Sequence, residues 1–350
     1  MWGYLGDRYG RLKALYGSIF IYSIATFGCS LLHNSVTYGV LRFLAGFGIA
    51  GEVGAATTLI AELMHPQKRG WGIAIIAGIG CLGPAAAVLI SWFFDWRATY
   101  VVAGVMGLGL LVLRMRLTEP LFFKKINSSG NRQGSLKLLI QPEQALIFIS
   151  CIFIGAAAIY ANWFLNFFSL ELSRSVLAEG EIFNQKTSLL IFYIGLGLGD
   201  ASVCVISQLW RSRRKALTSF LTLGAMTTAI YLVIGPFIKM TAMTLYGIYF
   251  IIAFASGIWA LFIMIGAEHV GTNIRATTAT LISNIARAST IPVLFMFQGL
   301  KTIMSITDAA ALIGFMLYAL AFWGLSRLRE THGLDLDYVE TLETTPHARL

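Results

Sequence analysis

The sequence predicts an all-α integral membrane protein, a bundle of about ten transmembrane helices in two similar halves. Three observations support this fold class. Of the 350 residues, 57% are hydrophobic and only 12% are charged, whereas soluble domains carry about 25% charged residues. Apolar runs long enough to cross a membrane recur along the whole chain, and short motifs of its first part return in its second part.

Each predicted helix is a run of about 20 apolar residues, which is long enough to cross a hydrocarbon core of ~30 Å. The runs are continuous and do not alternate with period two, which favours helices over a membrane β-barrel. We predict spans at residues 14–32, 37–63, 71–94, 97–117, 143–170, 187–209, 216–237, 241–267, 276–299 and 307–327.

Basic residues are concentrated in alternate connections between these helices, which marks the cytoplasmic side of a membrane protein. Of the 26 Lys and Arg residues, 19 lie in the first loop, in every second connection after it and in the tail, and five lie in the intervening connections. The pattern places the 118–142 linker and the C-terminus in the cytoplasm. The lipid bilayer, expected to be a bacterial inner (plasma) membrane, therefore accounts for the net charge of +9, and no nucleic acid is needed.

Three motifs repeat between the two parts of the chain. "RLKAL" at 11–15 returns as "RRKAL" at 213–217, "AELMHPQKRG" at 61–70 aligns with "AEHVGTNIRA" at 267–276, and "RLTE" at 116–119 returns as "RLRE" at 327–330. The nearly constant interval predicts two homologous halves in the same orientation, an architecture typical of transporters.

We therefore predict an N-terminal half at 1–117, a linker at 118–142, a C-terminal half at 143–328 and a tail at 329–350. The second half has two helices before its copy of the first loop and the first half has none. The repeat thus predicts an architecture in which two further helices precede Met1.

The loop "GYLGDRYGRLKAL" at 3–15 combines glycines with dense charge. Glycines permit a sharp turn between two helix ends, and Asp7 can accept a helix N-terminus or an arginine in a contact that closes the cytoplasmic side. Topology anchoring is the alternative role for such charges. In the second copy Leu209 replaces the aspartate, so we expect that loop to be a basic anchor.

This loop resembles the signature between the second and third helices of the major facilitator superfamily. The segments "LRFLAGFGIAGE" at 41–52, "GIGCLGPAAAVL" at 78–89 and "RETHGLDLDYVE" at 329–340 are similar to further motifs of that family. Arg42, Gly46, Gly51 and Glu52 look most like its metabolite:proton symporter and sugar-porter branches. The resemblance implies ten of twelve helices of a secondary transporter that works by alternating access, with H+ as the expected coupling ion and without a cofactor. The expected solute is a small organic anion, a zwitterion or a sugar-like metabolite.

We assign a cytoplasmic gate to the charged and glycine positions of the first loop and to the repeated Glu and Arg positions. These residues are Gly6, Asp7, Arg8, Gly10, Arg11, Glu52, Glu62, Arg69, Glu268 and Arg275.

Ionisable residues inside the spans cost at least ~2.5 kcal/mol at mid-depth unless they face water or a partner. The resemblance implies substrate or proton coupling for Arg42, against a structural hydrogen-bonding role. Arg287, with Asn284 one turn earlier on the same face, is a candidate to hold an anionic substrate group. Asp200 is either a proton carrier or the partner of Arg287.

Two further groups complete the candidate residues. In "YANWFLNFF", Tyr160, Asn162, Trp163 and Asn166 combine amides with aromatic rings and either line a solute cavity or form packing hydrogen bonds. "GFGIAG" spells a dinucleotide fingerprint but lacks the strand that this site requires, so we assign its glycines to helix packing. Pro84 after Gly83 removes a helical hydrogen bond. The packing set is Gly46, Gly48, Gly51, Gly83 and Pro84.

The remaining motifs do not indicate an enzyme. The four cysteines form no CxxC pair, and the five histidines have no metal-ligand spacing. Neither GxSxG nor a phosphate-binding GxxxxGK[ST] occurs. The alternative to a transporter is a truncated, non-transporting membrane fragment or interaction protein. No oligomeric state is predicted.

Overall fold

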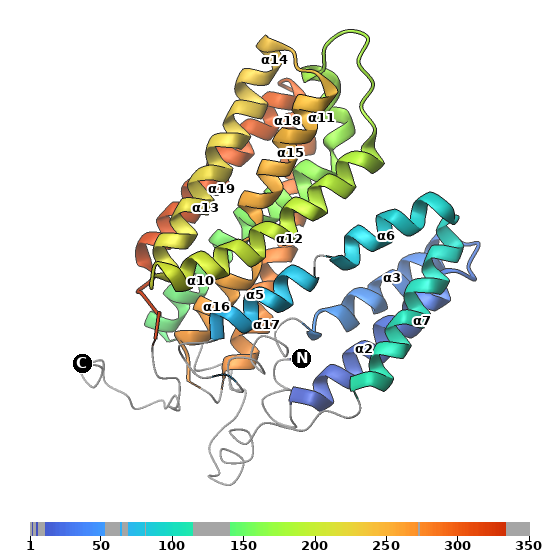
Figure 1. Cartoon of the computed structure of the whole chain (residues 1–350), viewed down its shortest axis with the longest axis vertical. Helices are drawn as coiled ribbons and strands as arrows, with labels where there is room; N and C mark the ends of the chain where they lie inside the picture. Colours follow the sequence, from blue (N-terminus) through green and yellow to red (C-terminus); the bar gives the residue numbers. More distant parts are fainter. Residues whose placement is uncertain are drawn as a thin grey trace.

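A computed structural model of the chain describes residues 2, 5, 11–52, 64, 69–80, 82–114, 141–271 and 274–333. These residues are almost entirely helical, and within them no β-strand forms beyond a single bridge between Leu177 and Met240. Figure 1 shows the helices side by side as a bundle. The predicted all-α membrane bundle is confirmed.

All ten predicted spans contain an apolar helix. Within the described ranges, eight segments are long and apolar enough to cross a membrane: Leu12–Cys29, Trp96–Arg114, Gln144–Leu165, Gln185–Leu209, Arg213–Ile238, Ala242–Glu268, Thr277–Leu300 and Ile306–Arg327. The predicted spans 37–63 and 71–94 contain the shorter apolar helices Ser35–Ile49 and Gly78–Phe93.

Several spans are divided into shorter helices (Figure 1). The first group of elements is α2 (Arg11–Cys29), α3 (Ser35–Ile49), α5 (Arg69–Gly80), α6 (Leu82–Phe93) and α7 (Trp96–Arg114). The second begins with α10 (Pro142–Ile159), the π-helical η1 (Tyr160–Leu165), α11 (Ser169–Val176), α12 (Gln185–Leu209) and α13 (Arg213–Ala229). It continues with the π-helical η2 (Ile230–Ile234), α14 (Gly235–Ile238), α15 (Ala242–Ser256), α16 (Trp259–Glu268), α17 (Arg275–Ala288), α18 (Thr290–Leu300) and α19 (Ile306–Arg327).

Proline explains one of these divisions. Pro292 lies four residues after Ala288, the last residue of α17. A proline has no N–H to donate and its ring clashes with the carbonyl four positions earlier, so the helix is interrupted at that point. The chain resumes after Ser289 as α18.

Close packing joins α2 to α3 and α7. Gly48 of α3 lies directly against α2, since a Cβ at this position would stand 2.7 Å from the backbone nitrogen of Tyr22. A Cβ at Gly51 would stand 2.6 Å from the ring of Trp2. Gly46 and Gly83 differ from these two, because a Cβ there would meet no described atom within 4 Å.

The helices from α10 to α19 pack around a large apolar core. Among them α12 packs along α15, and α10 packs along α19 and α17. The first group reaches this second group mainly through α5 and α6, which lie along α12 (Figure 1). The predicted boundary between two homologous halves at 118–142 lies almost wholly outside the described residues and stays a prediction.

The contact between α12 and α15 depends on a glycine, which leads to a first prediction. A Cβ at Gly199 would overlap the carbonyl oxygen of Phe254, and backbone atoms cannot move aside as a flexible side chain can. We expect Gly199→Ala to lower the free energy of unfolding by about 1–3 kcal/mol, the usual effect of overpacking. Gly247→Ala on α15 is the matched control, because a Cβ there meets no described atom within 4 Å. Denaturant unfolding in detergent that shows equal losses for both variants would contradict this expectation.

Candidate functional site

Arg287 lies in the last turn of α17, where its guanidinium packs over the indole of Trp259, 5.0 Å from the ring centroid. The side chain is half-buried. Among the described residues no carboxylate lies within ion-pair distance of it. A cation–π contact uses the face of the guanidinium and not its N–H donors. A role for Arg287 in holding an anionic substrate group stays a prediction.

Asp200 is buried on α12 and does not pair with Arg287, one of the two roles that the sequence suggested. Its Oδ1 accepts a hydrogen bond from the backbone N–H of Ala260 at 3.1 Å, and the backbone of Trp259 also donates to this carboxylate. The residues that donate are the first two of α16, whose N–H groups have no partner within their own helix. The role of Asp200 as a proton carrier stays a prediction.

Asn284 connects the two groups of helices. Its Nδ2 donates to the carbonyl oxygen of Thr280, one turn earlier on α17, and to that of Ala50, which follows α3, both at 2.8 Å. One side chain thus ties the end of α3 to the middle of α17. The amide is engaged with backbone, so a direct role in holding a solute stays a prediction.

The first six residues of the segment "YANWFLNFF" form the π-helical turn η1, and Asn166 follows it directly. Such turns occur often at functional sites. Tyr160 is buried and donates to the carbonyl oxygen of Ala310 at 2.5 Å, which is a packing contact. Asn166 is buried and its Oδ1 has no hydrogen-bond donor in the described part of the chain. Asn162 is half-buried, and Trp163 is exposed and stacks on Phe167.

Arg42 lies on α3 within an aromatic cluster. Its exposed guanidinium stands 5.6 Å from the ring centroid of Tyr100 on α7. The hydroxyl of Tyr100 bonds to that of Tyr38 at 2.7 Å, and the ring meets Trp96 edge to face. These rings hold the arginine in position, and its coupling role stays a prediction.

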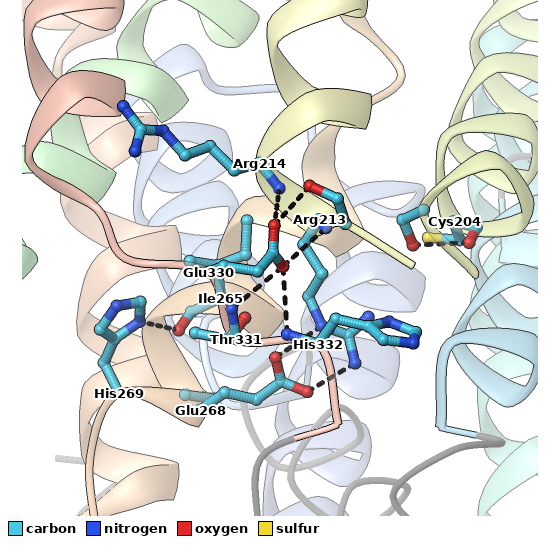
Figure 2. Close-up of polar contacts among 12 residues, drawn as sticks. Cys204, Arg213, Arg214, Ile265, Glu268, His269, Glu330, Thr331 and His332 are labelled. Carbon is cyan, nitrogen blue, oxygen red and sulfur yellow. Dashed lines mark hydrogen bonds and ion pairs between the residues drawn. The ribbon is translucent and has the colours of Figure 1, made fainter. Parts of the chain in front are cut away.

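A buried ion pair joins α13 to α16. The guanidinium of Arg213 contacts both carboxylate oxygens of Glu268 at 2.7 and 2.8 Å, and both side chains are almost inaccessible to solvent. Figure 2 shows Arg213 extending from the start of α13 down to Glu268. Arg275, the first residue of α17, donates to the carbonyl oxygens of Ala267 and Val270 at the end of α16, where a cation complements the helix dipole.

Glu330, just after α19, completes this arrangement from the far end of the chain. Its carboxylate accepts the hydroxyl of Ser212 and the backbone N–H groups of Arg213 and Arg214, and so caps the start of α13 (Figure 2). Burial raises the pKa of Glu330, but these hydrogen bonds together with that from His332 outweigh burial and lower it below its ordinary value. We call Ser212, Arg213, Glu268, Arg275 and Glu330 the Arg213 cluster.

A pH-dependent prediction follows from this cap. Glu330→Gln should lower the free energy of unfolding by about 1 kcal/mol at neutral pH, the usual value of an N-cap. Because the pKa of Glu330 is lower in the folded state, its contribution is fully present above the ordinary value of 4.5 and is lost as pH falls below it. The free energy of unfolding is measured for the wild type and for Glu330→Gln from pH 7 to pH 3.5. The difference between the two free energies should shrink toward zero as the pH falls, and a constant difference would contradict the prediction.

The sequence assigned a role to only some members of the Arg213 cluster. Glu268 and Arg275 were predicted gate residues, whereas the 205–217 loop was expected to be a basic anchor and Glu330 had no assigned role. The loop lacks its own aspartate, and the carboxylate comes from the segment after the last helix. The repeated "RLRE" at 327–330 was the signal that pointed to it.

The remaining gate predictions are less fully described. Glu52, which follows α3, pairs with Arg114 at the end of α7 at 3.0 Å, and both side chains are half-buried. Gly6, Asp7, Arg8, Gly10 and Glu62 lie outside the described residues, as do the side chains of Arg11 and Arg69. The predicted network between Glu52 and the first loop therefore stays a prediction.

Comparison with known proteins decides the family. The family model of the Major Facilitator Superfamily matches residues 1–293. The chain belongs to this superfamily. With its apolar helices, membership in the superfamily makes it a multi-pass integral membrane protein.

Superfamily members of known name are similar to different extents of the chain. The niacin transporter NiaP of Acinetobacter baylyi is 29% identical over 34% of this chain and 28% of its own length, so the chain spans less than a third of that relative. The "Probable 4-methylmuconolactone transporter" of Cupriavidus pinatubonensis is 24% identical over 96% of this chain and 79% of its own. Among solved structures, a variant of the E. coli fucose:proton symporter FucP has a TM-score of 0.70 at 14% identity, covering 94% of this chain and 86% of that one. This likeness shows the shared fold.

Proposed function

We propose that this protein carries a small organic anion or zwitterion across the membrane by alternating access, driven by a proton gradient. Arg287 is the observation that carries the proposal. It lies in the apolar segment Thr277–Leu300 and, within the described chain, has an aromatic neighbour and no carboxylate partner. An arginine at membrane depth is costly unless it meets an anion, water or a partner, and its planar N–H donors match a carboxylate.

The named relatives support this solute class. Niacin and 4-methylmuconolactone, the solutes in the names of two relatives, each carry a carboxyl group. The name of the structural relative FucP includes proton symport, which supports coupling to H+. A sugar-like metabolite carries no charge for the guanidinium of Arg287 to pair with, so we favour the carboxylate.

For the transport cycle we propose that the helices up to α7 and those from α10 move against each other as two halves. The positive charge of the 205–217 loop supports a cytoplasmic position for the Arg213 cluster. In this proposal the bond from Asn284 to Ala50 and the pair of Glu52 with Arg114 belong to the contacts that change when the cytoplasmic side opens. Arg42 is the candidate for proton coupling.

The proposal is tested in proteoliposomes that contain the purified protein. We expect uptake of radiolabelled nicotinate to rise when the outside is made acidic and to stop when a protonophore collapses the gradient. Nicotinamide has the same ring and no carboxylate, so its uptake should remain at the level of empty liposomes. Uptake that ignores the pH gradient would contradict proton coupling. Failure of nicotinate, gentisate and other small carboxylates to bind or enter would contradict the solute class.

A further inference from the structure

The helix that crosses the membrane between residues 242 and 268 is broken, and a residue of another helix supports the break. Helix α15 ends at Ser256 and α16 begins at Trp259. The residue before α16, Ile258, provides no side-chain cap. Asp200 on α12 supplies the missing acceptor, since its carboxylate receives the N–H groups of Trp259 and Ala260. Capping by Asp normally comes from the residue at the helix start itself, and here it comes from a neighbouring helix.

Glycines hold the two helices close enough for this capping. A Cβ at Gly257 would overlap the backbone of Gly199 and Asp200, and a Cβ at Gly199 would overlap the carbonyl of Phe254. Backbone therefore touches backbone at this level of the bundle. A short side chain such as that of Asp200 can then reach the start of α16, and a small shift of that start is transmitted at once to α12.

The first residue of α16 is also the aromatic neighbour of Arg287. The backbone N–H of Trp259 is held by Asp200, and its indole lies against the guanidinium of Arg287 at 5.0 Å. A second ring, that of Phe262, meets the indole edge to face at 5.1 Å between centroids. The position of the indole, and with it that of the guanidinium, thus depends on where α16 begins.

We propose that Asp200 is a positioning residue for the anion site at Arg287, acting through the start of α16 and the indole of Trp259. This inference rests on the proposed function, in which Arg287 holds the carboxylate of the solute. Asp200 itself contacts the solute in no step of this proposal. The carboxylate oxygens of Asp200 position the start of α16 by accepting its N–H groups. The indole of Trp259 then orients the guanidinium of Arg287, and the guanidinium binds the carboxylate of the solute.

The test compares two replacements of the same shape. Asp200→Asn keeps an oxygen that accepts an N–H, whereas Asp200→Leu keeps the branched outline and removes both acceptors. Ser207→Ala is the control, because Ser207 is buried on α12 and its hydroxyl bonds, among the described contacts, only to the carbonyl oxygen of Cys204 on the same helix. Two quantities are measured in detergent. The first is the affinity for nicotinate and for nicotinamide. The second is the Trp259 emission, which is the fluorescence of each protein minus that of the same protein carrying Trp259→Phe.

We expect Asp200→Leu to weaken nicotinate binding about tenfold, the loss that one hydrogen bond to a charged group produces. It should also change the emission that depends on Trp259. Asp200→Asn should stay within about threefold of the wild type in affinity, with the emission preserved, and Ser207→Ala should alter neither quantity. Adding Asp200→Leu to Trp259→Phe should cost nothing further, because a shared route makes the two effects non-additive.

Three results would overturn the inference: unchanged Trp259 emission in Asp200→Leu, additive losses of affinity in the double variant, or a loss in Asp200→Asn equal to that in Asp200→Leu. If Asp200→Leu does not fold, Asp200→Ala replaces it in the same comparison. The emission measurement needs no solute. It therefore decides whether Asp200 positions Trp259 even if the wild type binds no carboxylate, an outcome that would refute the proposed function separately.

Discussion

Arg287→Gln should weaken binding of nicotinate by at least about 100-fold, because a bidentate, charge-assisted pair is replaced by a neutral amide. Arg287→Lys should retain more affinity, with a loss of about tenfold, since the charge remains while the planar pair of donors is lost. Binding of nicotinamide, which has no charge to neutralise, should change little in either variant. Equilibrium binding of both ligands to the purified proteins measures the difference.

Arg174→Gln is the matched control for this experiment. Arg174 is exposed in the last turn of α11, so its replacement removes one positive charge from the protein and leaves Arg287 in place. We expect nicotinate affinity to stay at the wild-type level. Equal losses of affinity for nicotinate and nicotinamide in Arg287→Gln would show that the arginine supports the fold of the site and does not bind the charged group of the solute.

Glu268→Gln should lower the free energy of unfolding by about 3–5 kcal/mol, the usual result of removing one partner from a buried ion pair. The guanidinium of Arg213 would remain buried without its counter-charge, as both side chains are at most 2% exposed. Denaturant unfolding in detergent at neutral pH measures the loss. Replacing both partners by apolar residues of similar size, as in Arg213→Met with Glu268→Leu, should recover most of it.

The exposed pair of Lys301 with Glu171 provides the control for this prediction. Its atoms lie 3.6 Å apart and its side chains are 33% and 49% exposed. Exposed pairs contribute about 0–1 kcal/mol, so Glu171→Gln should have a small effect. If Glu268→Gln is no more destabilising than Glu171→Gln, the buried pair does not hold α13 against α16.

The sequence predicted the fold well because its main signals are local. Each span is a continuous apolar run of a length that favours a transmembrane helix. The break before Trp259 was not predicted, since the span from 241 to 267 contains no proline. Its cause is the approach of Gly199 and Asp200 from another helix, which no local pattern reveals.

The candidate site was predictable in its residues and not in its contacts. The cost of burying charge in a membrane singled out Asp200 and Arg287. Both contact the first residues of α16: Asp200 accepts the backbone N–H of Ala260, and Arg287 lies against the indole of Trp259. Their partners are a backbone N–H and an indole, which carry no distinguishing pattern in a sequence rich in apolar residues. Glu330 was missed for a related reason, since it binds Arg213 across 117 positions of the chain.

The cap that Glu330 places on α13 also orders events during synthesis. Ser212 and Glu330 are 118 positions apart, and at about 5–20 residues per second the ribosome needs roughly 6–24 s to cover that distance. During this interval α13 exists with its first N–H groups uncapped by Glu330. The last helix must be synthesised before the cap can close, so the contact of Glu330 with α13 is among the last to form between helices made well before it.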